Sequence, residues 1–424
     1  MKTTEWINAI QNGTSTAFNR LYAADPSAKE RFINAIHSFE KLYGKDRDIA
    51  IFSVPGRSEI AGNHTDHNHG CVLAGAIDRD IIAIAAKNDD GMIRVQSEGY
   101  REINVSLEKS PDPKNFDGFC STALVAGVAG GFQKDGHKVG GFDAYTTTRV
   151  LKGSGLSSSA AFEVMIGNIL NHLYNDSTIP NPEIAKIAQY AENVYFGKPC
   201  GLMDQMACAV GGFVFIDFAD PKNPTIEPID FSLTDAGYAL AIVNTGGSHS
   251  DLNDDYASVP TEMKKVAAYF GRPVLRGTTE EEIIANAAVL RRALGDRAVL
   301  RALHFVRENA RVLSQADALK NGRIGDFLAG EIASGRSSFE YLQNVYTNKN
   351  VAEQGLSLAL AIAEGALASR GGGWRVHGGG FAGTIQSFVR TADAEEYARL
   401  MDSVFGKGAA MPLNIRPLGA VKLF

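Results

Sequence analysis

The stretch Val150–Val164, VLKGSGLSSSAAFEV, changes character in its middle. A loop rich in glycine and serine runs into a helix-like pattern, in which apolar residues recur every three or four positions. These apolar residues are Phe162, Met165, Ile166, Ile169, Leu170 and Leu173. A loop that opens a helix leaves backbone N–H groups unpaired beside the positive end of the helix dipole, so the segment predicts an anion site.

The neighbouring hydroxyls of Ser157–Ser159 favour the phosphate chain of a nucleotide as that anion. On this segment alone, an ordinary serine cap behind flexible glycines is an equal alternative. The chain has no Walker A sequence, because Gly131–Gly136 is followed by His137 instead of lysine. The GxGxxG match at Gly378–Gly383 lies too near the end of the sequence for half of a dinucleotide-binding fold.

Two further glycine-dense segments are SVPGRSEIAGNHTD at Ser53–Asp66 and RVHGGGFAGT at Arg375–Thr384. In this order the three motifs resemble those of the GHMP family of small-molecule kinases and, within it, the galactokinases. The galactokinase motifs are approximately GRVNLIGEHTDYN, GLSSSA and GGGFGG, where this chain has GRSEIAGNHTDHN, GLSSSA and GGGFAG. A fourth segment, PCGLMDQ at Pro199–Gln205, matches the one that carries the family's catalytic aspartate.

Composition and charge indicate a soluble globular protein. The 424 residues suffice for two domains, and 45% hydrophobic with 21% charged residues is ordinary for that class. A formal charge of −6 gives no reason to expect nucleic acid or an anionic membrane as a partner. No apolar run is long enough for a signal peptide or a membrane span, and the four cysteines show no CxxC spacing. We therefore expect a cytoplasmic protein, and we expect it to act as a monomer on small molecules.

Helix-like and strand-like patterns intermix along the chain, which predicts a mixed α/β (α+β) protein. Helix patterns cover about 15–44, 119–133, 159–174, 182–196, 279–319, 323–342 and 351–369. Strand patterns begin at Ile49 and recur at Gly212–Phe218 and Tyr238–Asn244. The proline-rich DPKNPTIEP at Asp220–Pro228 is interpreted as a crossing between domains.

The resemblance implies a two-domain GHMP kinase fold. Its N-terminal domain, residues 1–216, would be like ribosomal protein S5 domain 2 and would carry the sugar motif and the phosphate loop. Its C-terminal domain, residues 217–424, would be ferredoxin-like, with the active site in the cleft between the two.

The resemblance also implies ATP-dependent transfer of a phosphoryl group to the anomeric hydroxyl of galactose, with Mg²⁺ as the metal. ATP would bind the loop residues Gly153, Ser154, Gly155, Leu156, Ser157, Ser158 and Ser159. Ser159 and Glu192 match the family's magnesium ligands, although a lone helical glutamate is more often a solvated one. Asp204 would accept the proton of the sugar hydroxyl while Arg57 steadies Asp204 and the migrating charge. A structural Asp204–Arg57 ion pair is the alternative.

Sugar recognition is predicted for Asn63, His64, Thr65 and Asp66 and, through HSDLNDDY, for Tyr256. A turn that carries amide, imidazole and carboxylate groups can discriminate sugar hydroxyls, since a wrong epimer leaves those groups unpaired.

The sugar motif departs from the galactokinase pattern, which has glutamate in place of Asn63 and asparagine in place of Glu59. A neutral amide instead of a carboxylate weakens a charge-assisted sugar contact by about 1–2 kcal/mol. The departure would tolerate a modified C6, such as the carboxylate of a uronic acid. Galacturonate, N-acetylgalactosamine and arabinose all stay open as substrates beside galactose.

Two other kinds of function compete with a kinase. HTDHNH at His64–His69 is dense in metal-ligating residues, but its order differs from the HxHxDH of metallo-β-lactamase-type hydrolases. Some relatives of the galactokinases sense sugars without catalysis, having lost residues just after the serine run. Because Ser159, Ala160 and Ala161 are intact here, catalysis is favoured.

Overall fold

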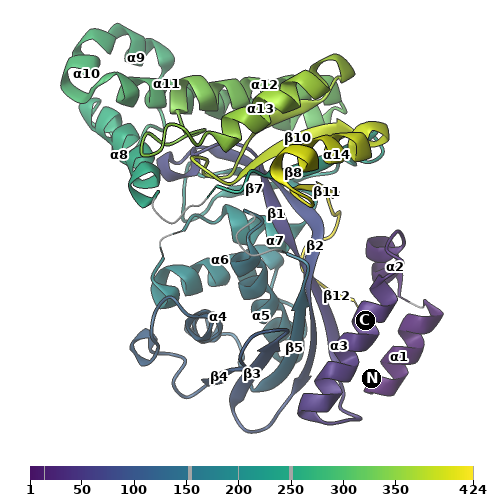
Figure 1. The fold of residues 1–424 in the computed structure, drawn as a ribbon. Helices are drawn as coiled ribbons and strands as arrows, with labels where there is room; N and C mark the ends of the chain where they lie inside the picture. Colours follow the sequence, from purple (N-terminus) through teal and green to yellow (C-terminus); the bar gives the residue numbers. More distant parts are fainter. Residues whose placement is uncertain (14, 151–154, 199, 248–251, 424) are drawn as a thin grey trace.

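The computed structural model describes residues 1–424 except 14, 151–154, 199, 248–251 and 424. The described residues form two β-sheets with helices packed against both, which confirms the predicted mixed α/β fold (Figure 1).

The larger sheet contains eight strands within the described part of the chain. Six of them follow the order β12-β1-β2-β5-β3-β4, while β6 pairs with β2 and β7 pairs with β6. The strands are β1 (Ala50–Ala61), β2 (Cys71–Lys87), β3 (Met92–Ser97), β4 (Ile103–Ser106), β5 (Phe142–Thr148), β6 (Phe213–Asp217), β7 (Thr225–Ile229) and β12 (Val421–Lys422). The β3–β5 pair is parallel, and the neighbouring β2–β5 pair is antiparallel.

Helices cover both faces of this sheet (Figure 1). One face carries α1 (Thr3–Asn12), α2 (Thr16–Tyr22) and α3 (Ala28–Tyr43). The other carries α4 (Ser121–Lys134), α5 (Ser158–Tyr174), α6 (Asn181–Tyr190) and α7 (Met203–Val210). Successive side chains of a strand point to opposite faces. Ala50 and Phe52 of β1 therefore pack in the core with α4–α7, while Ile51 packs with α1–α3.

The smaller sheet has four described strands in the order β11-β8-β10-β9. Its strands are β8 (Tyr238–Asn244), β9 (Gly373–His377), β10 (Thr384–Arg390) and β11 (Ala410–Leu413). The helices of this part are α8 (Asn253–Tyr269), α9 (Glu280–Ala285), α10 (Ala287–Leu294), α11 (Asp296–Lys320), α12 (Ile324–Ser337), α13 (Gly355–Leu367) and α14 (Ala394–Phe405). Leu240 and Ile242 of β8 join the same core as Phe52 of β1, so one apolar core is continuous between the two sheets.

The proline-rich segment is not a crossing between domains, as the sequence had suggested. Thr225–Ile229 is strand β7, which pairs with β6 at the edge of the larger sheet. Pro228 is tolerated there because an edge strand has one side without ladder hydrogen bonds. The chain passes to the smaller sheet only after β7, and β12 returns to β1 from the far end of the sequence. The division at residue 216 stays a prediction.

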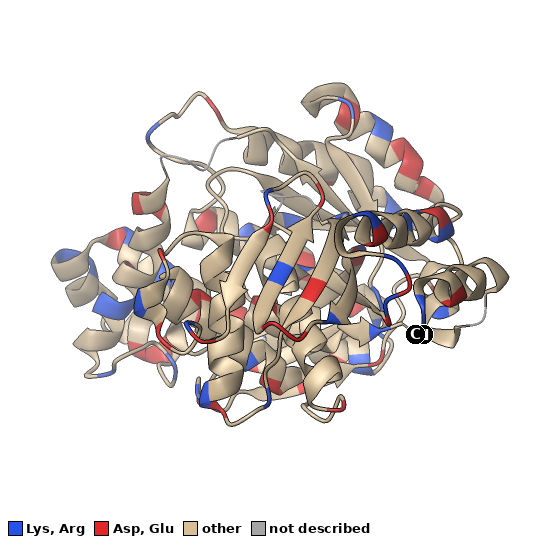
Figure 2. Cartoon of the chain, turned by 90° about the horizontal axis from the view of Figure 1, so that it is seen from below, with Lys and Arg blue, Asp and Glu red and all other residues tan. Residues whose placement is uncertain are grey.

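Charged residues lie mainly on helices and loops, with both signs interspersed, while the strands are mostly uncharged (Figure 2). Among the described residues, none of the helices combines the length and apolarity needed to cross a membrane.

Candidate active site

The glycine–serine loop leads into α5 and is fixed against β1. Within it, Gly153 and Ser154 lie outside the described residues. The carbonyl oxygen of Leu156 accepts a hydrogen bond from the backbone N–H of Arg57, 3.1 Å away. Ser157 caps α5 in the left-handed conformation (φ 56°), and Ser158 is the first residue of the helix. The half-buried serines therefore gather at the helix N-terminus, where unpaired N–H groups favour an anion.

Asp204, in the first turn of α7, lies between Arg57 and Ser157. Nε of Arg57 donates to Oδ1 of Asp204 across 2.7 Å, and the Ser157 hydroxyl donates to Oδ2. Nη1 of Arg57 also donates to the carbonyl of Gly155, which ties the ion pair to the loop. Burial by itself would lower the pKa of Arg57, but Asp204 and, more weakly, Cys208 and Glu59 together outweigh this effect and raise the pKa. The Asp204 side chain is 33% exposed, so a ligand can reach it.

A second group of carboxylates comes from α5 and from the turn that follows α6. Glu192 is in a π-helical turn, Ala191–Phe196, that continues α6. Its Oε2 accepts from Nε2 of Gln205 across 2.8 Å, and its Oε1 lies 3.2 Å from Nζ of Lys198. Glu163 of α5 also accepts from Gln205 Nε2, at 3.1 Å. Glu192 is therefore a buried, partnered carboxylate and not the solvated one that a lone helical glutamate usually is.

Glu163 is fully buried, and its Oε1 has no hydrogen-bond partner. Burial raises its pKa well above the ordinary value, and the nearby charge of Glu192 adds to the effect. Among the described residues, no three His, Cys, Asp or Glu side chains form a ready metal cluster. Magnesium, however, commonly takes only one or two protein oxygens beside phosphate oxygens and water. Glu192 and the Ser159 hydroxyl would supply two such oxygens, and the orphaned Oε1 of Glu163, which shares the Gln205 amide with Glu192, is a further candidate.

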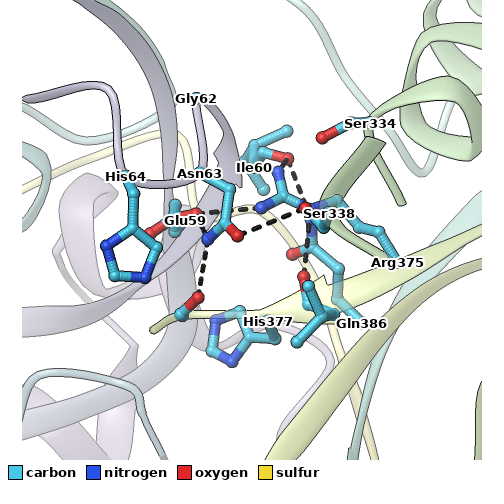
Figure 3. Close-up of polar contacts among 12 residues, drawn as sticks. Glu59, Ile60, Gly62, Asn63, His64, Ser334, Ser338, Arg375, His377 and Gln386 are labelled. Atoms are coloured by element: carbon cyan, nitrogen blue, oxygen red, sulfur yellow. Dashed lines mark hydrogen bonds and ion pairs between the residues drawn. The ribbon is translucent and has the colours of Figure 1, made fainter. Parts of the chain in front are cut away.

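The sugar motif divides into buried and accessible residues. Asn63 is 0% exposed, and its amide is used entirely by the protein (Figure 3). Nδ2 donates to Oε1 of Glu59 (3.0 Å) and to the carbonyl of Gly378 (2.7 Å). Oδ1 accepts from Asn344 (2.7 Å) and from Ser338 (3.2 Å). Asn63 thus joins the first glycine motif to the third and has no hydrogen-bonding capacity left for a sugar.

Thr65 likewise contacts the protein itself: its buried hydroxyl lies within hydrogen-bonding distance of the carbonyls of Gly62 and Cys71. His64 and Asp66 are only half-buried. Nε2 of His64 lies 2.9 Å from the carbonyl of Gly379, and burial lowers the pKa of His64 to about 4. Asp66 faces the segment before α7, since a methyl group on Gly201 would lie 2.7 Å from its Oδ2.

The third glycine motif touches both the loop and Tyr256. The Tyr256 hydroxyl donates to the carbonyl of Gly380 across 2.8 Å. The ring of His377 lies against the glycine–serine loop, because a methyl group on Gly155 would be 3.2 Å from it. Nδ1 of His377 is 2.9 Å from the hydroxyl of Thr384, and its buried Nε2 has no partner. Burial, with Arg57 and Arg375 nearby, lowers the pKa of His377 to about 3, so the ring is neutral.

The chain is similar to known proteins along most of its length. The model of the GHMP kinase N-terminal domain matches residues 123–212, and the galactokinase galactose-binding signature matches residues 37–87. The galactokinase of Streptomyces coelicolor is 32% identical over 375 residues, which cover 87% of this chain and 91% of that protein. A galactokinase of Actinobacillus pleuropneumoniae serotype 5b is 32% identical over 380 residues, covering 88% and 93%. The chain belongs to the galactokinase family of GHMP kinases.

The galactokinase-family assignment confirms the resemblance seen in the sequence and makes the chain a phosphotransferase. It agrees with the fold. A crystal structure of the Lactococcus lactis galactokinase complexed with galactose superposes with a TM-score of 0.76 at 23% identity, covering 91% of this chain and 98% of that one. A mevalonate kinase from Methanococcus jannaschii superposes with a TM-score of 0.60 at 14% identity, covering 87% and 98%.

Among the residues that the structure brings to the candidate site, Glu163, Lys198, Gln205 and His377 were not predicted from the sequence. One signal for Glu163 was available, since it follows Ser159 by four residues and shares its helix face. His377 stands directly before the glycines of the third motif, but nothing in the sequence places its ring against Gly155.

Proposed function

We propose that this chain is an ATP-dependent kinase that converts galactose to α-galactose 1-phosphate. The observation that carries the proposal is Asp204, a partly exposed carboxylate held by Arg57 on one oxygen and by Ser157 of the phosphate loop on the other. The galactose-binding signature at residues 37–87 and the galactokinases among the relatives support galactose as the acceptor.

In the proposed reaction, Asp204 accepts the proton of the anomeric hydroxyl as that oxygen attacks the γ-phosphorus of ATP. The bond from the sugar oxygen to phosphorus forms while the bond from phosphorus to the bridging oxygen of ADP breaks. Arg57 keeps its charge throughout, because its pKa is raised by Asp204. It orients the carboxylate and offsets the negative charge that gathers between sugar and phosphate.

The loop residues from Gly155 to Ser159 would hold the phosphates with N–H groups and hydroxyls. Ser159 and Glu192 would hold the magnesium ion, with Glu163 as a third oxygen behind them. A bound magnesium ion would neutralise charge on the phosphate chain. The unpartnered Oε1 of Glu163 supports a cation at this place.

Sugar recognition is proposed for His64, Asp66 and Tyr256, while Asn63 and Thr65 fix the motif from behind. The neutral His64 ring can exchange hydrogen bonds with a hydroxyl, and Asp66 lies close to the segment that carries Asp204. Because the Asn63 amide is fully used by the protein, the proposal gives it no direct sugar contact.

The test is an ATP-consumption screen of the purified chain with galactose, N-acetylgalactosamine, galacturonate, arabinose and glucose. We expect galactose to give the highest kcat/KM and ³¹P NMR to show an α-linked 1-phosphate product. If the enzyme consumes no ATP with any of these sugars, the proposal is contradicted. A clear preference for another sugar would replace galactose as the acceptor while leaving the kinase chemistry in place.

A further inference from the structure

The Glu192 carboxylate has two differently placed oxygens. Oε2 is held by Gln205, which is fully buried. Oε1 is paired instead with the ammonium group of Lys198, 3.2 Å away, whose side chain is 59% exposed. The Glu192 side chain itself is only 5% exposed. The solvent-exposed Lys198 ammonium group therefore pairs with Oε1, the Glu192 oxygen that Gln205 does not hold. That is the oxygen that a divalent cation arriving from solvent would have to use.

Lys198 is attached in a way that lets its side chain move while its backbone stays. The backbone N–H groups of Gly197 and Lys198 both donate to the carbonyl of Glu192, at 3.0 and 3.2 Å. Gly197 has a left-handed conformation (φ 84°) that a residue with a side chain rarely adopts. The ammonium group that donates to Glu192 stands at the end of a flexible four-carbon stem.

The charges around Lys198 favour a cation at this point. Three acidic side chains lie near it, Glu163, Glu192 and Asp204. Asp204 is already paired with Arg57, and burial raises the pKa of Glu163 well above its ordinary value. Lys198 interacts electrostatically with both Glu192 and Asp204, so its charge acts on a predicted metal ligand and on the predicted proton acceptor. A divalent cation and an ammonium group on the same carboxylate would repel one another strongly.

We propose that Lys198 is a built-in counter-cation, which occupies Glu192 in the empty enzyme and moves to the nucleotide phosphates when a divalent cation takes its place. A lysine ammonium group is a compact cation that commonly binds phosphate in proteins. The exchange keeps the buried carboxylate paired in both states, which avoids the cost of leaving an uncompensated charge inside the protein. This inference rests on the proposed function for its second half, the move to the nucleotide.

The first measurement uses the metal alone. Binding of Mn²⁺ to the full chain without nucleotide is followed by electron paramagnetic resonance. We expect Lys198→Met to bind Mn²⁺ about tenfold more tightly than wild type, since a charge-assisted contact no longer competes. Lys198→Arg should stay close to wild type, and Glu192→Gln should lose the binding. Lys186→Met, at an exposed lysine of α6, is the matched control and should change nothing.

The second measurement is the affinity for Mg·ATP, by equilibrium binding. We expect a net weakening of about tenfold in Lys198→Met, because the lost contact with the phosphates outweighs the gain in metal affinity at Glu192, and we expect Lys198→Arg to restore most of the loss. Thermal unfolding without ligand checks that each variant is folded. Unchanged Mn²⁺ affinity in Lys198→Met, or unchanged Mg·ATP affinity, overturns the proposal. If no sugar is phosphorylated while both shifts are seen, the proposed function fails and the exchange at Glu192 stands.

Discussion

The side-chain amide of Asn63 donates a hydrogen bond to Oε1 of Glu59, 3.0 Å away, and the same oxygen is paired with Arg375 at 2.9 Å (Figure 3). Compared with the galactokinase motif, the carboxylate and the amide have exchanged positions. The contact explains why Glu59 and Asn63 depart from the motif together, since the hydrogen bond between a carboxylate and an amide is kept. The negative charge of this pair now lies at Glu59, where Arg375 compensates it.

Asn63→Glu alone should therefore be strongly destabilising. It would place a second carboxylate beside Glu59 and remove the donor to the Gly378 carbonyl. Glu59→Asn alone should also cost about 3–5 kcal/mol, because it leaves the buried Arg375 without its partner. The double variant should recover most of both losses. Urea unfolding of the four proteins gives the coupling free energy.

Additive losses in that cycle would show that the two positions are independent. Selectivity among sugars is best compared between wild type and the double variant, since Asn63→Glu alone disturbs the contact between the two glycine motifs. We expect both proteins to rank galactose and galacturonate in the same order, because the Asn63 amide is used by the protein and contacts no sugar.

Asp204→Asn should lower kcat by about 10²–10⁴-fold, because an amide cannot accept the proton of the sugar hydroxyl. Affinity for a non-hydrolysable ATP analogue should change little, since the amide oxygen of the introduced asparagine can still accept a hydrogen bond from Arg57. Arg57→Lys serves as a companion variant, which keeps a charge but loses the contact of Nη1 with the Gly155 carbonyl. Turnover of Asp204→Asn near the wild-type rate would remove Asp204 from the proposed role.

Long buried helices and strands could be predicted from the sequence, while breaks between them could not. The predicted helix at 159–174 is α5 (Ser158–Tyr174), and the strand at 212–218 is β6 (Phe213–Asp217). The stretch 279–319, in contrast, is three helices, α9, α10 and α11. One break lies at Gly295, which has φ 87°. Apolar periodicity continues across so short an interruption, so the pattern does not reveal it.

The site was predictable where it lies in motifs and unpredictable where it depends on packing. Asp204 and Arg57 are 147 positions apart, and the motifs still identified both residues of the pair that the structure joins. For Asn63 the motif was misleading. Its residue type suits a sugar contact, but the side chain is buried and its amide is hydrogen-bonded to four protein partners. Hydrogen-bond saturation is a property of the folded surroundings, which a local motif does not contain.

The glycines of the third motif should differ sharply in their tolerance of a methyl group. At Gly380, φ is 79° and an added Cβ would lie 2.0 Å from the Asn344 carbonyl oxygen, which is backbone and cannot yield cheaply. Gly380→Ala should give little folded protein. Gly378 has a similar φ of 67° but open space around its Cβ position, so Gly378→Ala should cost only about 1–2 kcal/mol of backbone strain. The two variants are compared by their soluble yield and by urea unfolding. Equal losses of yield and of unfolding free energy in both variants would rule out the predicted clash at Gly380.

A buried glutamate should make stability fall as pH rises. Burial raises the pKa of Glu331 to about 8, against an ordinary value of 4.5 in the unfolded chain. Between these values the folded protein keeps a proton that the unfolded chain has released. The free energy of unfolding therefore falls with rising pH, by up to about 1.4 kcal/mol per pH unit, and the loss is complete above the folded pKa.

Glu331→Gln cannot ionise, and its single amide oxygen can keep one of the two hydrogen bonds that Gln315 and Gln386 donate to different oxygens of Glu331. Its free energy of unfolding should exceed that of wild type by more at pH 8.5 than at pH 5.5, measured by urea unfolding in matched buffers. Glu364→Gln, at an exposed residue of α13, controls for the loss of a surface charge. If the difference between Glu331→Gln and wild type is the same at both pH values, Glu331 titrates normally, and burial does not hold its proton in the folded protein.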